Sequence, residues 1–223
     1  MFELSKVETA EIREAMVGHL RRVDESLAQR VADGLGLDKL PDPTPTAVLA
    51  DGRPNSPALQ IVDRMKAALE DRFVGILVND GSDGKTIAAL RKAEMDAGAT
   101  VKVVAPKIGG VKLADGSRLP AEGQLAGTPS RVFDAVAVVL SESGAATFAK
   151  EGAAIDFVRN AFGHLKAFGH LKAIAINAGG QALLQASGVV PDAGVIAAHD
   201  TTAFIEAAKT RQWDRERNVR TLA

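Results

Sequence analysis

Short apolar runs alternate with helical patterns along residues 58–223. The first run, Phe73 to Val78, is β-branched, flanked by charge and too short for a helix, which predicts a strand buried on both faces. A helical pattern follows, with Asp83 as its N-cap and Gly98 as its stop. A second apolar run, Val101 to Ala105, completes a strand–helix–strand unit. Such a unit implies a right-handed crossover and a parallel sheet.

The alternation continues to the end of the chain. A β-hairpin is expected around Asp115-Gly116. Alternating strands and helices of these lengths predict an α/β fold, a three-layer, doubly wound parallel sheet of the flavodoxin-like type. The further elements expected are a strand at Val136–Leu140, one or two helices within Gly144–Phe162, a strand at Ala173–Ile176, a helix at Gly180–Ala186, a strand at Val195–Ala198 and a helix at Thr201–Trp213.

Residues 1–37 carry a helical pattern of a different kind. Steps of three and four residues place apolar side chains on one stripe after an N-cap at Thr9, and Asp24 is a position where the helix can restart at a bend. The stripe consists of Ile12, Met16, Leu20, Val23, Leu27 and Val31. This segment is expected either to pack on its own domain or to bind a larger body that the chain lacks.

A proline-rich stretch separates the two patterns. Five of the nine prolines lie in residues 38–57, which predicts an extended linker. Ser56-Pro57 is a typical helix start, and Leu59, Val62, Met65 and Leu69 form the apolar face of the helix expected after it. The predicted organisation is a helical segment at 1–37, a linker at 38–57 and an α/β domain at 58–223.

Composition narrows the possible classes of protein. A net charge of −1 offers no electrostatic case for binding nucleic acid or an anionic membrane, and no apolar run reaches about 18 residues. The start of the chain has no signal-peptide pattern, so a cytoplasmic location is expected. Cysteine and tyrosine are both absent from the 223 residues. Their absence excludes disulfides, thiolate metal sites and a cysteine nucleophile.

One six-residue segment is repeated without change. Residues 161–166 and 167–172 both read Ala-Phe-Gly-His-Leu-Lys. Six residues rotate a helix by about 240°, so both copies cannot serve the same face, and one copy is expected to be absorbed as an extra turn or loop. Gly163 or Gly169 is the expected helix stop. A metal site at His164 and His170 is the alternative, but no carboxylate or thiolate accompanies them.

Ligands of open α/β sheets bind beyond the carboxyl ends of the strands, which selects five candidate segments. A phosphate cradle in the turn Asp80–Gly84 lacks the spacing of known phosphate-binding loops, and a structural turn is favoured there. Helix capping is favoured at Ser141 and Ser143, and a helix start at His199-Asp200. The five segments are Asn79–Gly84, Pro106–Gly110, Ser141–Gly144, Asn177–Gln181 and His199-Asp200.

Several segments together resemble one known family. Residues 75–141, GILVNDGSDGKTIAALRKAEMDAGATVKVVAPKIGGVKLADGSRLPAEGQLAGTPSRVFDAVAVVLS, are similar to the C-terminal domain of large-subunit haem catalases. Residues 151–174, with one copy of the repeat left out, resemble the same proteins. Residues 2–37 resemble the end of the catalase helical region, which precedes a proline-rich linker. The resemblance covers nearly the whole chain, and the duplicated six residues depart from it.

The resemblance implies what the chain lacks as well as its fold. Catalases decompose hydrogen peroxide on a haem whose iron is bound by a tyrosine, with a distal histidine and asparagine, and this chain has no tyrosine. The domain is also similar to class I glutamine amidotransferases, whose relatives place a cysteine where Asn177 lies here. The resemblance therefore implies no catalytic, cofactor-binding or metal-binding residue in this chain, with haem belonging to the parent catalase.

The leading hypothesis is a non-catalytic domain of a large-subunit catalase, present as a fragment or as a short protein. It would stabilise the tetramer, shape access of peroxide and, as the resemblance suggests, offer a chaperone-like surface to unfolded proteins. Its expected partners are the catalase core or a second copy, bound through the N-terminal stripe. Two alternatives are a small-molecule-binding module using Asp80–Gly84 and a degenerate hydrolase working through Ser141, Ser143 or His199.

Overall fold

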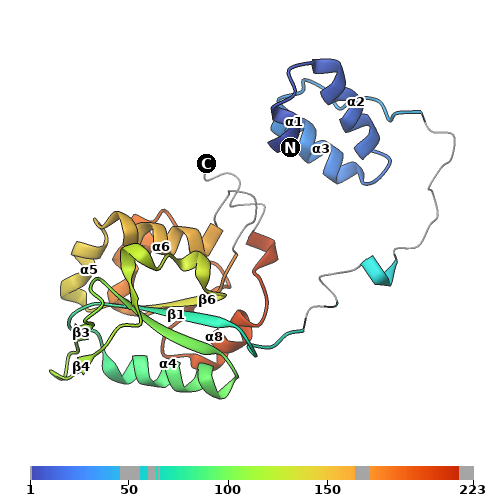
Figure 1. Ribbon diagram of the computed structural model, residues 1–223. Coiled ribbons are helices and arrows are strands. Elements are labelled where there is room, and N and C mark those ends of the chain that lie inside the picture. The colour runs from blue at the N-terminus through green and yellow to red at the C-terminus, as the bar shows by residue number, and fades with distance from the viewer. Residues whose placement is uncertain (1, 46–55, 60–63, 65, 164–170, 216–223) are drawn as a thin grey trace. The chain divides into compact units, whose positions relative to one another are not determined.

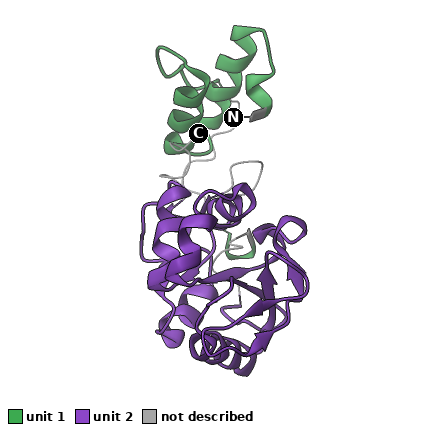
Figure 2. Ribbon diagram, turned by 90° about the vertical axis from the view of Figure 1, so that its left-hand side faces the viewer, with its two compact units in different colours: residues 1–65 green, residues 66–223 purple. Residues whose placement is uncertain are grey.

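The computed structural model describes residues 2–45, 56–59, 64, 66–163 and 171–215 (Figure 1). Backbone packing divides the chain into two compact units, Met1–Met65 and Lys66–Ala223 (Figure 2). Within the described ranges, no helix combines the length and the apolar character needed to cross a membrane.

The second unit is built on a parallel sheet. In its described part the sheet has six strands in the order β5-β2-β1-β6-β7-β8. Without the edge strand β5, this is the 2-1-3-4-5 order of flavodoxin-like proteins, and the predicted fold class is confirmed. The strands are β1 (Phe73–Val78), β2 (Thr100–Ala105), β5 (Gly123–Gln124), β6 (Ala135–Val139), β7 (Ile174–Ile176) and β8 (Val195–Ala197).

Helices cover both faces of this sheet (Figure 1). One face carries α4 (Gly84–Asp96) and α8 (Thr201–Ala208), and the other carries α5 (Glu142–Phe148), α6 (Gly152–Gly163) and α7 (Gln181–Ala186). Two apolar clusters result, because neighbouring residues of a strand point to opposite faces. Val136 and Val138 of β6 pack with Phe157 of α6, whereas Ala137 packs on the side of α4 and α8.

The predicted hairpin is also present. It pairs β3 (Val111–Lys112) with β4 (Arg118–Leu119) in antiparallel register. Gly116 has a φ of 87°, a conformation that glycine adopts at no steric cost. The hairpin is tied to the loop after β1, because Gly81 N donates to Lys112 O at 2.7 Å.

Two helices differ from their predictions. In the described part of the helix expected after Ser56-Pro57, Pro57–Leu59 form a 3-10 turn, Arg64 is also in 3-10 conformation, and Lys66–Leu69 are not helical. Val62 and Met65 lie outside the described residues. Leu69 is instead buried in the α4–α8 cluster. The helix expected over Thr201–Trp213 ends at Ala208. Beyond that residue, Gln212 N donates to Leu171 O at 2.8 Å, so a tertiary contact replaces further helix.

The first unit contains α1 (Phe2–Ser5), α2 (Ala10–Leu20) and α3 (Glu25–Leu35). The prediction of one continuous apolar stripe is wrong, because the chain turns between α2 and α3 and the two helices pack on each other. The helix restarts after Asp24, as expected, and Asp24 caps α3 by accepting from Leu27 N at 2.7 Å. The buried apolar cluster in the described part of this unit consists of Val17, Ala28, Val31 and Ala32, whereas Ile12, Met16, Val23 and Leu27 are exposed.

The segment after α3 packs onto α2. Thr44 N donates to Gly18 O at 3.1 Å, and Arg21 Nη1 donates to Pro41 O at 2.8 Å. A Cβ atom added to Gly18 would lie 2.7 Å from Asp42 O, which explains glycine at this contact. The beginning of the predicted linker is thus hydrogen-bonded to the first unit.

Candidate functional site

The carboxyl edge of the sheet brings together the loops that follow β1 and β6. Asn79 is buried at the end of β1, and its Oδ1 accepts from Ser141 N at 2.8 Å. The Ser82 hydroxyl lies 2.7 Å from Val139 O and 2.9 Å from Asn79 Oδ1, and it accepts from Asn79 N. These groups join the two loops and satisfy each other, so they leave little hydrogen-bonding capacity for a ligand.

The turn Asp80–Gly84 is a structural turn and not an anion cradle. Asp83 caps α4 by accepting from the backbone of Lys85 and Thr86, and hydrogen bonding by the Thr86 hydroxyl lowers the pKa of its carboxyl. Asp80 Oδ1 accepts from Lys112 N at 2.8 Å. The amides of Gly81 and Ser82 in the turn, and of Lys85 and Thr86 at the start of α4, are already bonded within the protein.

Asn177 occupies the strand-to-helix turn after β7. Its Oδ1 accepts from Leu140 N and Gly180 N, both at 3.0 Å, and its Nδ2 donates to Leu140 O at 2.8 Å. The amide therefore bridges the ends of β6 and β7 as a backbone mimic. Ser141 Oγ donates to Asp80 O at 2.7 Å and lies 3.4 Å from Ser143 Oγ. It also caps α5 by accepting a hydrogen bond from Gly144 N.

Two glycines show how tightly this edge is packed. A Cβ atom at Gly144 would lie 1.7 Å from Asn79 Nδ2, and one at Gly179 would lie 2.0 Å from Leu140 O. Real Cβ atoms do not approach other atoms so closely, so both positions require glycine. The crevice in which flavodoxin-like folds bind ligands is filled here by the protein's own loops.

The other two candidate segments also have structural roles. Asp200 caps α8 by accepting from Ala203 N at 2.9 Å, which confirms the predicted helix start, and His199 is exposed beside it. Gly110 closes the turn after β2 with its N–H on Lys107 O at 3.0 Å. Neither segment places a nucleophile next to a base.

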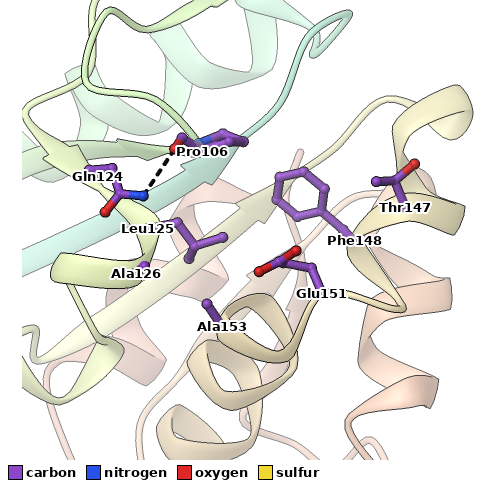
Figure 3. Close-up of a pocket in the computed structure, with 8 residues that line it drawn as sticks. All are labelled: Pro106, Gln124, Leu125, Ala126, Thr147, Phe148, Glu151 and Ala153. Atoms are coloured by element: carbon purple, nitrogen blue, oxygen red, sulfur yellow. Dashed lines mark hydrogen bonds between the residues drawn. The ribbon is translucent and has the colours of Figure 1, made fainter.

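A shallow hollow opens on the α5–α6 side of the same edge (Figure 3). Its volume is about 240 Å³, and mainly apolar side chains line it. Glu151 also lines it, with its carboxylate drawn between Leu125 and Phe148 (Figure 3), and Lys150 lines an adjoining depression. Gln124 is already bonded to Pro106 O. The hollow has room for a small apolar group but presents no catalytic constellation. Its lining consists of Pro106, Gln124, Leu125, Ala126, Thr147, Phe148, Glu151 and Ala153.

Two buried ionisable groups escaped sequence reasoning. Glu94 shares a face of α4 with Ile87 and Leu90, and neither of its carboxylate oxygens has a hydrogen-bond partner among the described residues; burial raises its pKa to about 8. Lys172 donates to Ser130 O at 2.6 Å, and burial lowers its pKa to about 7. The spacing 87, 90, 94 places Glu94 on the apolar face and was the available signal.

The residues present do not fit a haem site. The sequence has no tyrosine or cysteine, and the hollow is not lined by histidine or methionine. His19 and His199 are exposed, while His164 and His170 lie outside the described residues. Among the residues that the structure describes, no three histidine or acidic side chains form a metal-binding group. No step through haem is therefore assigned to this chain.

Fold and site together define a flavodoxin-like α/β domain whose ligand crevice is filled by its own side chains. Residues 70–215 match the family described as the C-terminal domain found in long catalases, and residues 1–35 match the family described as catalase-related immune-responsive. The chain belongs to the family of C-terminal domains of long catalases, as its resemblance predicted.

Curated relatives carry the same regions within longer proteins. The chain is 40% identical to Catalase C of Rhizobium meliloti (strain 1021), covering 98% of this chain and 31% of that protein. It is 38% identical to Catalase HPII of Mycobacterium avium, covering 74% of this chain and 23% of that protein. It is 32% identical to Catalase HPII of Pseudomonas aeruginosa, covering 96% of this chain and 30% of that protein. The chain thus spans less than a third of the length of these relatives.

Proposed function

We propose that this chain acts as the non-catalytic C-terminal part of a large-subunit catalase, in which it contributes to stability and assembly. The match of both units to catalase-related families carries the proposal. The packing at the carboxyl edge of the sheet supports it, because the side chains of Asn79, Ser82 and Asn177 form hydrogen bonds with the protein's own backbone. Peroxide decomposition would belong to the haem-bearing remainder of the parent protein.

The exposed apolar side chains of the first unit are the proposed contact with that remainder. Ile12 and Met16 are four residues apart on α2 and therefore share a face, and they are 54% and 42% exposed. Leu27 on α3 is 38% exposed. Exposed apolar patches on folded units mark interaction sites, and the catalase core or a second copy of this chain are the occupants proposed.

Reconstitution tests the assembly role. The chain is added to a large-subunit catalase shortened before its C-terminal region, and binding is followed by light scattering while thermal inactivation of peroxide turnover is measured. We expect binding and a longer half-life of activity. Ile12→Gln with Met16→Gln should weaken both effects, whereas Glu14→Gln, exposed on the same helix, should not. No binding and an unchanged half-life would refute the assembly role.

Two further measurements test the remaining parts of the proposal. An absorbance spectrum of the chain after growth with a haem precursor should be flat above 320 nm, and a Soret band with peroxide turnover above that of free haem would contradict a non-catalytic role.

A chaperone-like surface predicts suppressed aggregation of a heated client protein. Equal aggregation with and without the chain would remove that part alone.

A further inference from the structure

The duplicated segment spans the connection between α6 and β7. Both copies read Ala-Phe-Gly-His-Leu-Lys, at residues 161–166 and 167–172. The structure describes the first three residues of the first copy, which end α6, and the last two residues of the second copy, which lead into β7. The described residues at the two ends of the connection show how it is closed.

One backbone hydrogen bond closes the connection. Lys172 N donates to Ala161 O at 3.0 Å, and Leu171, the residue before it, has a left-handed φ of 42°. This pairing is the one found at many helix ends, where a left-handed residue is followed by an N–H that bonds to the carbonyl five residues earlier. Ala161 and Lys172 are eleven residues apart. Within one copy, however, the alanine and the lysine are five apart, which is the spacing that this helix end requires.

Two residues after α8, Gln212 and Arg215, hydrogen-bond to the two sides of this connection. Arg215 Nη1 donates to Phe162 O at 3.1 Å and to Lys172 O at 2.8 Å, and its guanidinium lies 4.0 Å from the centre of the Phe162 ring. Gln212 N donates to Leu171 O at 2.8 Å. The carbonyls on the two sides of the connection are therefore satisfied by residues outside the repeat.

Each side-chain position at this junction is filled by one residue. Phe162 is 5% exposed and Leu171 is 2% exposed, and both pack in the apolar cluster on the side of the sheet covered by α5, α6 and α7, together with Val136, Val138 and Phe157. Lys172 is 1% exposed, with its amine on Ser130 O. One position accommodates one leucine and one lysine, so the second copy's Leu171 and Lys172 exclude their equivalents in the first copy.

We infer that the fold uses one composite copy of the repeat, Ala161-Phe162-Gly163 from the first copy and Leu171-Lys172 from the second. The repeat residues in the described contacts of this closure are among these five, so the α6–β7 connection is a point at which this domain accepts inserted chain. A loop that lengthens between fixed ends loses little stability, because closure entropy grows only with the logarithm of its length.

The two copies provide matched variants for the test. Leu165→Ala and Leu171→Ala change the same residue within the same Phe-Gly-His-Leu-Lys-Ala sequence. We expect Leu171→Ala to lower the melting temperature by roughly 5–15 °C, as for other buried leucines, and Leu165→Ala to change it by about 2 °C at most. Leu171→Met, a milder change, serves if the alanine variant does not fold, and it should also exceed Leu165→Met.

Deletion of one copy is the second arm. Removing residues 161–166 or residues 167–172 produces the same sequence, and that protein should fold with a melting temperature within a few degrees of the parent. Failure of the deletion variant to fold would overturn the inference, as would an effect of Leu165→Ala equal to that of Leu171→Ala. If both single variants are neutral and the double variant is strongly destabilised, the copies exchange places, which also overturns the single composite copy.

Discussion

Single residues in this domain show how charges are placed inside an α/β fold. Arg215 is 3% exposed, and its guanidinium donates two hydrogen bonds to the Asp192 carboxylate, at 2.6 and 2.7 Å. Partial burial opposes ionisation of Asp192, but hydrogen bonding and charge from Arg215 outweigh it and lower the Asp192 pKa. Glu94 is the opposite case, because it is buried with no hydrogen-bond partner among the described residues.

The buried carboxyl of Glu94 should make stability fall as pH rises. Its pKa is about 8 in the folded protein and 4.5 in a model compound, so between these values the folded state holds a proton that the unfolded state has released. The contribution of this carboxyl to the free energy of unfolding is fully present below about pH 4.5 and is lost as the pH rises toward 8. At about 1.4 kcal/mol per pH unit, the loss between pH 5 and pH 7 is about 2–3 kcal/mol.

Urea unfolding of Glu94→Gln checks this prediction. The variant should lack the Glu94 part of the decline, so its stability relative to the parent should increase from pH 5 to pH 7. Glu142→Gln, an exposed site on α5, should follow the parent at both pH values. Parallel curves for the parent and Glu94→Gln would mean that the carboxyl is already ionised in the folded state.

Replacing Arg215 tests its contacts with the Asp192 carboxylate and with the carbonyls of Phe162 and Lys172. Arg215→Ala removes the guanidinium partner of Asp192, Phe162 O and Lys172 O, and we expect a loss of about 3–5 kcal/mol in the free energy of unfolding. Arg215→Lys should recover only part of it, since an ammonium group cannot reproduce the planar two-pronged contact. Thermal unfolding followed by circular dichroism measures both, with the exposed Arg118→Lys as the control. A lysine variant as stable as the parent would show that charge alone is sufficient.

Secondary-structure elements were predicted well where local pattern and burial agree. β1 is buried from Val74 to Val78 and β2 from Val103 to Ala105, because helices cover both sides of the sheet, and both apolar runs were visible in the sequence. Elements were misjudged where a tertiary contact ends them, as for α8, which stops at Ala208 while Gln212 binds Leu171. The two-residue strand β5 was missed because Gly123-Gln124 has no strand pattern of its own.

Close packing between loops is a property of elements that a glycine pair can test. Gly179→Ala places a Cβ atom 2.0 Å from Leu140 O, so the turn after β7 must shift, and we expect a loss of about 1–3 kcal/mol or more. At Gly152, the first residue of α6, a Cβ atom would have no neighbour within 4 Å. Gly152→Ala should be neutral or stabilising by about 0.4–1 kcal/mol. Equal melting temperatures for the two variants would show that the edge is not rigid.

The whole molecule consists of two units with separate apolar clusters. Every residue of the two large clusters lies at Leu69 or later, and every residue of the small cluster lies at or before Leu40. The small cluster has four buried side chains, of which two are alanines, so it supports little stability of its own.

Independent cores predict independent unfolding. A protein limited to residues 66–223 should keep the circular dichroism and the melting temperature of the main transition of the full chain. In the full chain, backbone amides of α2 and α3 should exchange with deuterium faster than those of β1 and β6. A shortened protein that fails to fold, or equal protection in both units, would show that the units stabilise one another.

Local patterns by themselves determined the βαβ order, the hairpin and the caps at Asp24, Asp83 and Asp200, since each depends on a few neighbouring residues. The absence of tyrosine and cysteine likewise excluded their chemistry from composition alone. Only the tertiary structure decided that Asn79 and Asn177 bond to backbone, that Glu94 is buried with no hydrogen-bond partner among the described residues, and that Leu171 is buried in the core. These outcomes depend on groups far apart in sequence meeting at one place, which periodicity along the chain does not encode.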